Sequence, residues 1–261
     1  MGDDAVVIAT PADHNINDIP GLSRTLNQSV QVAEACDAPV LIGVKPEFAS
    51  TGYGYIHCGK QLEFGDGPVR FFEADGFREK PMSEDAEAMF EDVFWRWNSG
   101  IFIWTHGVFK RELGKYAPEL FEVTRRVGKL KTAAAVAQYL RAGFAQAPNI
   151  SIDYALLEKM TRLVVAECSF DWADIGSWSA LRRQIRPEEH NNVVRGLFAG
   201  LDTENCIIVG DSQRLIATID VRDLIIVSQD DVTLVCHEQS AQRVKELVKK
   251  LDADPGLRKF L

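Results

Sequence analysis

Several short stretches of this chain carry side chains that are suited to bind phosphate, sugar or a divalent cation. The stretch PADHNI places Asp13 soon after the apolar run of residues 6–8. Mg²⁺ prefers one or two carboxylates together with substrate phosphates, so a carboxylate that follows a buried strand is well placed to hold it. The alternative is that Asp13 caps the turn that follows. Asp13 is therefore a candidate metal ligand.

A second carboxylate candidate lies far along the chain, in FDWADIGSW. Asp171 and Asp174 alternate there with aromatic and aliphatic residues, and Gly176 allows a sharp turn beside Asp174. If the fold brings Asp174 to Asp13, the two carboxylates can share one cation. The alternative is a surface turn that is held by its two tryptophans.

Neighbouring acidic and basic residues in FREKPM suit a phosphorylated sugar. Glu79 can accept hydrogen bonds from vicinal hydroxyl groups, and the Lys80 ammonium can pair with a phosphate. Pro81 prevents the preceding strand from continuing, so both side chains fall at a strand end. The alternative is an exposed charge cluster at a turn.

Glycines and an asparagine complete the set of candidates. In TGYGYI, Gly52 and Gly54 flank Tyr53 and would let backbone N–H groups approach a ligand closely. In WNSGIF, Asn98 offers both a donor and an acceptor to a sugar hydroxyl. Either stretch could instead be a turn that leads into a strand.

The elements that must position these residues alternate between strand and helix over the first two thirds of the chain. The unbroken β-branched run at residues 6–8 predicts a strand that is buried on both faces inside a parallel sheet. Ser83 is the expected N-cap of a helix at 82–94, and Gly65–Gly67 an expected turn. Alternation of this kind favours a mixed α/β sheet. Further strands are expected at 39–44, 51–56, 68–74, 100–104 and 162–170, and further helices at 22–35, 131–145 and 153–160.

The pattern of predicted secondary structure changes near His190, within RPEEHNN. Short β-like runs follow at close spacing and are separated by Gly, Asp and Asn turns. The chain closes with a helix at 240–251, whose apolar face is expected to serve for packing. We therefore expect two domains, at residues 1–188 and 189–261.

The overall composition excludes several classes of protein. The chain has 261 residues and a net charge of -9 with no basic block, which argues against a nucleic-acid or membrane surface. No apolar run reaches the roughly 20 residues of a membrane span. Asp3 and Asp4 stand where a signal peptide would carry basic residues, so we expect a cytoplasmic protein. The five cysteines form no CxxC pair, which indicates reduced thiols rather than a zinc site or disulfides.

Six motifs, taken in order, resemble those of the bacterial mannose-1-phosphate guanylyltransferases, also called GDP-mannose pyrophosphorylases. They are PADHNI, TGYGYI, FREKP, WNSGIFIW, SIDYALLEK and FDWADIGSW, and the resemblance runs from about Asp4 to the carboxyl terminus. It implies a Rossmann-like mixed α/β catalytic domain over residues 1–188. A short left-handed β-helix module with a terminal helix is implied over residues 189–261, and a homodimer is implied as well.

The resemblance also implies a reaction. GMP would pass from GTP to α-D-mannose 1-phosphate, giving GDP-mannose and pyrophosphate, as the sugar phosphate oxygen attacks the α-phosphorus in line. Catalysis would then rest on positioning and on neutralising charge at the phosphate oxygens.

By the same resemblance, the candidate residues take particular roles. Asp13 and Asp174 match the carboxylates that hold Mg²⁺. Lys80 matches the base that reaches the sugar phosphate, and Glu79 the acid that binds sugar hydroxyls. The remaining matches contact the sugar or line its pocket: the Gly54 N–H, the Asn98 side chain, Ser151 and Asp153, with Tyr53 and Trp172 shaping the walls.

One part of the family pattern has no counterpart here. Members carry a glycine-rich GGxGTR loop and a Pro-Lys pair that grip GTP, and nothing resembling them precedes Asp3. We therefore expect the chain to be nearly inactive by itself. Three explanations of the missing segment stay open: truncation, a wrongly assigned start codon, or a split gene whose separate chain supplies the segment.

Two alternatives stay open. One is a non-catalytic subunit that binds a sugar phosphate or GDP-mannose and docks on a full-length partner through an exposed sheet edge. The other is a relative that uses another sugar or base, such as glucose 1-phosphate or a cytidylyl group.

Overall fold

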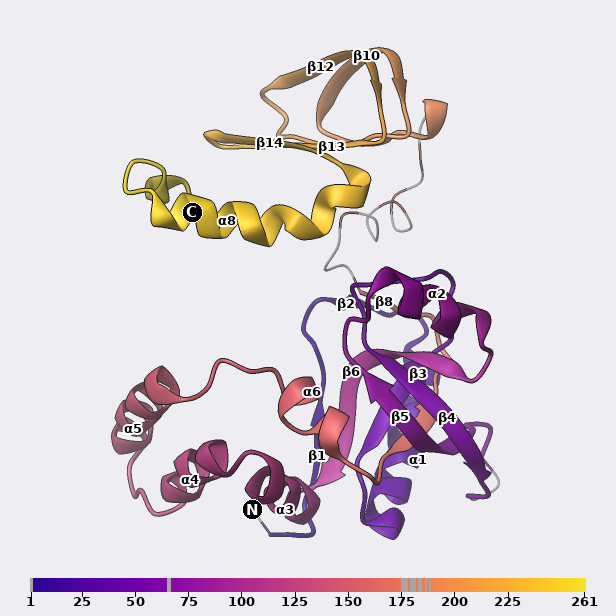
Figure 1. Ribbon diagram of the computed structural model, residues 1–261, viewed down its shortest axis with the longest axis vertical. Helices are drawn as coiled ribbons and strands as arrows, with labels where there is room; N and C mark the ends of the chain where they lie inside the picture. Colours follow the sequence, from indigo (N-terminus) through magenta and orange to yellow (C-terminus); the bar gives the residue numbers. More distant parts are fainter. Residues whose placement is uncertain are drawn as a thin grey trace. The chain divides into compact units, whose positions relative to one another are not determined.

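The protein consists of two compact units. A computed structural model describes residues 2–64, 67–174, 178, 182, 185, 187 and 189–261. The amino-terminal unit comprises Met1–Ala12 and Ile16–Trp172, and the carboxy-terminal unit comprises Asp13–Asn15 and Ala173–Leu261 (Figure 1). The division falls earlier in the chain than the expected boundary after residue 188. The predicted turn at Gly65–Gly67 lies partly, and Gly176 wholly, outside the described residues.

A six-stranded mixed sheet forms the centre of the amino-terminal unit. β3 and β7 pair in parallel, and the other neighbours pair antiparallel, so the predicted mixed α/β sheet is confirmed. The strand order is β1 (Val6–Ala9), β6 (Trp95–Thr105), β3 (Val40–Val44), β7 (Val164–Glu167), β5 (Phe71–Arg78) and β4 (Tyr55–Leu62).

The middle of this sheet is buried on both faces, as β3 illustrates. Leu41 packs into a cluster with α3 (His106–Tyr116) and α6 (Ile152–Ala155), whereas Val40 and Ile42 pack into a second cluster with α1 (Ile19–Cys36). Side chains alternate across a strand, so a continuous apolar run at this position fills both layers. The predicted buried strand at 39–44 is therefore confirmed.

The prediction for the first strand is wrong in one respect. β1 lies at the end of the strand order in the described sheet, pairs antiparallel with β6, and leaves Ile8 41% exposed. It is therefore neither buried on both faces nor part of a parallel pair. An apolar run of this length indicates a strand, but its place in the sheet depends on pairing with distant residues.

The helices confirm the predicted elements with one correction. Asp18 caps α1 by accepting a hydrogen bond from the Gly21 N–H at 2.9 Å. Ser83 is not the N-cap of α2 (Ser83–Glu91): it is the first helical residue, and Met82 occupies the cap position without a side-chain bond. The other predicted helices appear as α5 (Ala133–Gln146) and as α6 followed by the 3₁₀ turn η1 (Leu157–Lys159).

Two helices were not predicted. α3 follows β6 directly, and α4 (Pro118–Val127) follows α3. The Thr105 hydroxyl caps α3 by accepting from the Val108 N–H at 3.2 Å. Thr105 is also the last residue of β6, so the helix signal is hidden behind a strand-forming run.

Short parallel strands form most of the carboxy-terminal unit. In one sheet β9 (Val193–Arg195), β11 (Ile207–Val209) and β13 (Leu224–Gln229) pair in parallel, and β14 (Val232–His237) adds antiparallel to β13. In the other, β10 (Leu197–Glu204) pairs in parallel with β12 (Leu215–Arg222). The chain turns at residues with left-handed backbone, among them Asp202 and Asp220 with φ of 49° and 53°. This arrangement confirms the predicted β module.

The unit ends in helix, as predicted. The 3₁₀ turns η3 (Glu238–Arg243) and η4 (Arg258–Phe260) flank α8 (Val244–Ala253), and η2 (Glu189–Asn191) lies before β9. Leu247 and Val248 remain 43% and 44% exposed, so the apolar face of α8 is only partly packed. A short ladder, β2 (His14–Asn15) with β8 (Ala173–Asp174), completes the unit.

Two further features concern the helices and the cysteines. No helix of the described residues has both the length and the apolar character that a membrane crossing needs. All five cysteines are described and carry free thiols, as predicted.

Candidate functional site

The strand register of the amino-terminal unit brings Gly54, Glu79 and Asn98 together. Tyr55 on β4 lies opposite both Arg78 on β5 and Trp97 on β6, so the residues next to them converge. The Asn98 N–H donates to the Gly54 carbonyl at 2.7 Å. A Cβ atom at Gly54 would lie 2.4 Å from Glu79 Oε2, so any side chain at this position would require that carboxyl group to move.

Asp153 joins this cluster through Asn98. The Asn98 Nδ2 donates to Asp153 Oδ1 at 3.1 Å, and Asn98 Oδ1 accepts from the Gly100 N–H at 3.1 Å. The amide is thus held from both ends. We call Gly54, Glu79, Lys80, Asn98 and Asp153 the sugar cluster.

Glu79 is a buried acid in a partly negative environment. It is 9% exposed, and its Oε1 lies 3.3 Å from Lys80 Nζ. Burial raises the pKa of the Glu79 carboxyl, the nearby Asp153 charge raises it further, and the Lys80 ammonium opposes both. The group is therefore an acceptor held out of bulk water, whereas the Lys80 side chain is 54% exposed.

The SIDYALLEK stretch supplies two supports that the sequence analysis missed. Glu158 Oε1 accepts from the Glu79 N–H at 2.9 Å, and the Tyr154 hydroxyl donates to the Glu79 carbonyl at 3.5 Å. The next residue, Lys80, has a left-handed backbone with φ of 45°, a conformation that costs energy for a residue with a side chain. In the sequence, the only indication of these roles for Tyr154 and Glu158 was that both residues lie in the same motif as Asp153.

Ser151 lies apart from the buried members of the cluster. It is exposed at the N-cap position of α6, and its carbonyl accepts from the Ala155 N–H at 2.9 Å. It is therefore placed at the margin, two residues before Asp153.

Aromatic rings adjoin the cluster in sequence and pack on one another. The Tyr53 ring lies 5.0 Å from the Trp97 ring and 5.7 Å from the Trp172 ring, both with edge-to-face geometry. The Phe48 ring lies 4.8 Å from the Trp97 ring and 6.4 Å from the Tyr53 ring. The rings therefore pack as one aromatic group, and the expectation that Tyr53 and Trp172 shape the wall of a sugar pocket stays a prediction.

In the carboxy-terminal unit, the β2–β8 ladder brings the two metal candidates to one place. It sets His14 directly opposite Asp174, with the exposed Asp13 one residue before His14. Burial lowers the pKa of the His14 imidazole, whereas the charges of Asp174 and Asp13 act to raise it. Both carboxylates therefore lie close enough to act on a single ring.

This donor set suits some metals better than others. In the described part of the chain, no group of three or more His, Cys, Asp or Glu side chains is arranged to hold a metal ion. A tetrahedral zinc centre needs such a group, but Mg²⁺ keeps several waters and takes one or two carboxylates plus phosphate oxygens. Asp13 and Asp174 fit Mg²⁺.

Asp171, the other carboxylate of FDWADIGSW, has a structural role. It accepts from the Asp18 N–H at 2.6 Å, from the Asn17 N–H at 3.0 Å and from Asn17 Nδ2 at 2.7 Å. The bonds from Asp18 and Asn17 lower the pKa of the Asp171 carboxyl. Asp171 thereby fixes the chain at the start of α1.

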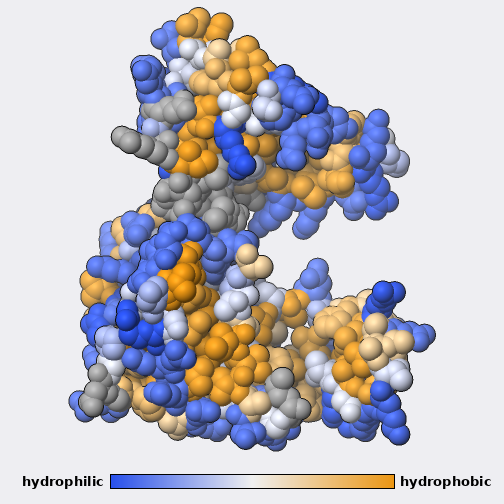
Figure 2. Space-filling model, turned by 180° about the vertical axis from the view of Figure 1, so that it is seen from behind, coloured by the Kyte–Doolittle hydropathy of each residue, from blue (hydrophilic) through white to orange (hydrophobic). Residues whose placement is uncertain are grey.

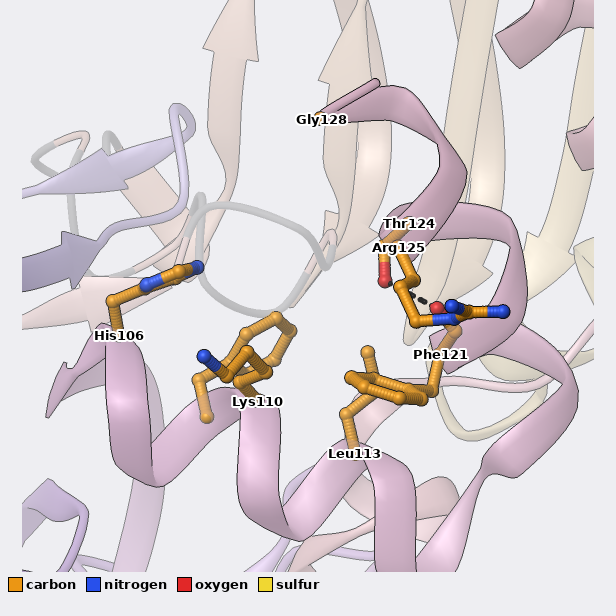
Figure 3. Close-up of a pocket in the computed structure, with 8 residues that line it drawn as sticks. His106, Lys110, Leu113, Phe121, Thr124, Arg125 and Gly128 are labelled. Atoms are coloured by element: carbon orange, nitrogen blue, oxygen red, sulfur yellow. Dashed lines mark hydrogen bonds between the residues drawn. The ribbon is translucent and has the colours of Figure 1, made fainter. Parts of the chain in front are cut away.

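A separate hollow lies between α3 and α4 (Figure 3). Its volume is about 280 Å³, and Phe109, Leu113 and Phe121 line it together with His106 and Lys110. The dashed line in Figure 3 marks the Thr124 hydroxyl donating to the Phe121 carbonyl at 2.9 Å. The predicted site residues do not line this hollow, and its apolar lining does not match a sugar phosphate.

Comparison with known families defines the class of protein. Residues 1–190 match the nucleotidyl transferase family, and residues 196–251 match the MannoseP isomerase/GMP-like beta-helix domain. The first match covers well over half of the chain. The chain therefore belongs to the nucleotidyl transferase family, and a β-helix domain follows the α/β domain in the sequence.

Individual relatives narrow the comparison. The mannose-1-phosphate guanylyltransferase of Escherichia coli is 34% identical over 250 residues, which are 95% of this chain and 53% of the relative. The alginate biosynthesis protein AlgA of Pseudomonas putida is 32% identical over 252 residues, 96% of this chain and 51% of the relative. The chain thus spans about half the length of these curated relatives.

Solved structures agree on the fold. A crystal structure described as mannose-1-phosphate geranyltransferase from Thermus thermophilus has a TM-score of 0.77 and 30% identity, covering 95% of this chain and 70% of that one. Mannose-6-phosphate isomerase from Helicobacter pylori has a TM-score of 0.53 at 23% identity, over 65% of this chain and 64% of that one, and shows the fold alone. The predicted family resemblance is confirmed.

Proposed function

We propose that this chain acts as a mannose-1-phosphate guanylyltransferase, which transfers GMP from GTP to mannose 1-phosphate and releases pyrophosphate. The observation that carries the proposal is the sugar cluster. In a chain of the nucleotidyl transferase family, a buried acid, an exposed lysine and an oriented amide meet around a glycine that leaves room for them.

Each member of the sugar cluster has a task that its surroundings support. Glu79 accepts hydrogen bonds from sugar hydroxyls, because burial removes competing water from it. Lys80, with its half-exposed ammonium, pairs with the sugar phosphate. Gly54 offers its backbone N–H to the sugar. The Asn98 side chain, which is oriented by its hydrogen bond to Asp153, makes a further hydrogen bond to the sugar. Ser151 lines the margin of the same pocket.

Mg²⁺ is the cation that we propose for Asp13 and Asp174. When bound, it neutralises charge on the phosphate groups of the substrates. Asp13 and Asp174 would hold the ion through their carboxylates, and its other ligands would be water and phosphate oxygens.

We further propose that the protein works in the cytoplasm, in GDP-mannose synthesis, as a homodimer. GTP is the expected nucleotide.

The test measures binding and turnover separately. Calorimetry with mannose 1-phosphate, and pyrophosphate release with GTP, mannose 1-phosphate and Mg²⁺, are both run on the 261-residue chain. Release that requires both substrates supports the proposal. Sugar phosphate binding without turnover, also after a chain that carries a glycine-rich GTP-binding loop is added, would support the non-catalytic alternative. Tighter binding of glucose 1-phosphate would support a relative with another sugar. A chain that binds none of these ligands contradicts the proposal.

A further inference from the structure

The turn that carries Glu79 and Lys80 lies just beyond the end of β5, where the sheet no longer supports its backbone. The ladder between β4 and β5 ends at the pair Tyr55 and Arg78, and β5 itself ends at Arg78. Pro81, which follows the turn, has no N–H to donate. The peptide groups of Glu79 therefore need hydrogen-bond partners from outside the sheet.

These partners come from α6 and η1. The Glu158 carboxylate accepts from the Glu79 N–H at 2.9 Å, and the Tyr154 hydroxyl donates to the Glu79 carbonyl at 3.5 Å. The bond to the carboxylate is shorter and charge-assisted, so it is the stronger of the two. Glu158 thus takes the place that the next residue of a neighbouring strand would take in a ladder.

Glu158 extends from a segment that is anchored in the core. Leu156 and Leu157, the two residues before it, are each 1% exposed and pack in the cluster that also contains Leu41 and Ile56. Because this backbone is already ordered by packing, the Glu158 side chain holds its partner at little further cost in conformational entropy. The carboxylate is therefore a fixed acceptor for the turn.

The backbone of Lys80 shows what this acceptor has to hold. It is left-handed, with φ of 45°, and a residue that precedes a proline is restricted further. A residue with a side chain keeps such a conformation only where the surrounding contacts enforce it. In this conformation the Lys80 ammonium lies 3.3 Å from Glu79 Oε1, so the acid and the base stand side by side.

We propose that Glu158 is a positioning residue for the sugar phosphate: it holds the Glu79 amide and so keeps Glu79 and Lys80 in the arrangement that binds the substrate. What matters is an acceptor oxygen at this distance, more than its charge. The inference rests on the proposed function, which assigns Glu79 to the sugar hydroxyls and Lys80 to the phosphate. The alternative is that Glu158 only closes the end of β5 and has no effect on the ligand.

The first experiment compares three replacements of Glu158 by calorimetry with mannose 1-phosphate on the 261-residue chain. Glu158→Ala should weaken binding about 30-fold, because the turn that carries two contact groups is released. Glu158→Gln keeps an acceptor oxygen at the same reach and should stay within about 3-fold of the wild type. Glu158→Asp keeps the charge but is one methylene shorter, so it should bind as weakly as Glu158→Ala.

A matched control and a folding check accompany these variants. Glu119→Ala removes an exposed carboxylate from α4 in the same unit and should leave the affinity for mannose 1-phosphate unchanged. Circular dichroism and thermal unfolding show whether each Glu158 variant is folded. The order of affinities among the Gln, Asp and Ala variants is then a readout that a purely structural role would not produce.

The second experiment needs no ligand and tests whether Glu158 holds the left-handed turn. Glycine tolerates a left-handed backbone and alanine does not, so Lys80→Gly should melt about 2–4 °C above Lys80→Ala. In a Glu158→Ala background the turn can relax, and the difference between the two Lys80 variants should disappear. An equal difference in both backgrounds would overturn the inference.

The outcomes for the inference and for the proposed function are distinct. A Glu158→Ala variant that binds mannose 1-phosphate as tightly as the wild type does would overturn the inference and leave the function standing. Wild-type affinity in Glu158→Asp, together with weak binding in Glu158→Gln, would overturn it too, since charge would then matter more than reach. A wild type that binds no mannose 1-phosphate contradicts the proposed function, and the inference fails with it.

Discussion

The two units hold their candidate groups in different ways. In the amino-terminal unit, all members of the sugar cluster except Asp153 lie within or next to long strands: β4 and β5 have 8 residues each, and β6 has 11. Asp153 lies on the short helix α6. In the carboxy-terminal unit, Asp13 and Asp174 depend on a ladder of two residues per strand. Glu79 is 9% exposed, whereas Asp13 is exposed.

This difference suggests how the sugar and the proposed magnesium ion would each be bound. A sugar needs several directed hydrogen bonds, and a buried, preorganised cluster provides them without reorganisation. A magnesium ion brings its own geometry and most of its ligands, so two carboxylates on a short ladder are sufficient. We infer that the sugar cluster is preformed.

The largest expected effect tests the metal pair. Asp174→Asn should lower Mg²⁺-dependent pyrophosphate release by about 1,000-fold, because it removes one of two anionic ligands. The β8 backbone pairing does not use the carboxylate, so thermal unfolding should change little. Asp171→Asn is the matched control in the same motif and should keep its turnover. Wild-type rates for Asp174→Asn would contradict the metal assignment.

A next, smaller effect tests whether the sugar cluster is preformed. Gly54→Ala puts a methyl group 2.4 Å from Glu79 Oε2 and must displace that carboxyl group. We expect about a 100-fold loss in kcat/KM for mannose 1-phosphate. Gly76→Ala, on the strand that leads to Glu79, meets its nearest atoms at 3.8 Å and should be tolerated. Equal behaviour of the two variants would show that the cluster adapts.

Variants of Lys80 show whether this residue contacts the sugar phosphate or the nucleotide. Lys80→Ala should raise KM for mannose 1-phosphate about 10-fold, the loss expected for one charged hydrogen bond, with little change in KM for GTP. Lys80→Arg keeps the charge and should recover part of the loss, whereas Lys60→Ala on β4 is the neutral control. An equal effect on both substrates would argue against the assigned contact.

The smallest expected effect is on stability and concerns pH. Glu79 has a pKa raised above its ordinary value of 4.5, so the folded state keeps this proton to a higher pH than the unfolded state does. Its contribution to stability is therefore full below pH 4.5 and is lost as pH rises through the raised pKa. Glu79→Gln removes the titration. Urea unfolding should show wild type losing stability relative to this variant as pH rises.

The control for this last measurement is Glu87→Gln on the exposed side of α2, which adds the same amide without burial. A constant stability difference between wild type and Glu79→Gln across the pH range would mean that the carboxyl group is not held in a desolvated site.

Local pattern was enough to identify many parts of the fold. The alternation of apolar runs and helical periods predicted β3, α1, α5 and the short parallel strands after His190, because these elements bury residues at a regular spacing. The same pattern did not predict α3, which begins where β6 ends, or α4, which follows α3. It also did not predict the position of β1 in the sheet.

By itself, the sequence determined which residues have suitable chemistry: carboxylates at Asp13 and Asp174, an acid beside a lysine at Glu79 and Lys80, and an amide at Asn98. Motif order also determined the family. Both are properties of residue type and spacing, which need no fold to be recognised.

Only the tertiary structure decided which groups meet. The ladder register sets Gly54 against Glu79, and the paired two-residue strands bring residue 14 to residue 174. It also showed that Glu158 accepts a hydrogen bond from the Glu79 backbone and that Asp171 accepts one from the Asp18 N–H at the start of α1. Alternate residues of β10 and β12 form one exposed apolar face, at the end of the unit where hydrophobic residues gather in Figure 2. These facts depend on pairing between distant segments, and the free energy of such pairing comes from the whole packed unit rather than from any local stretch.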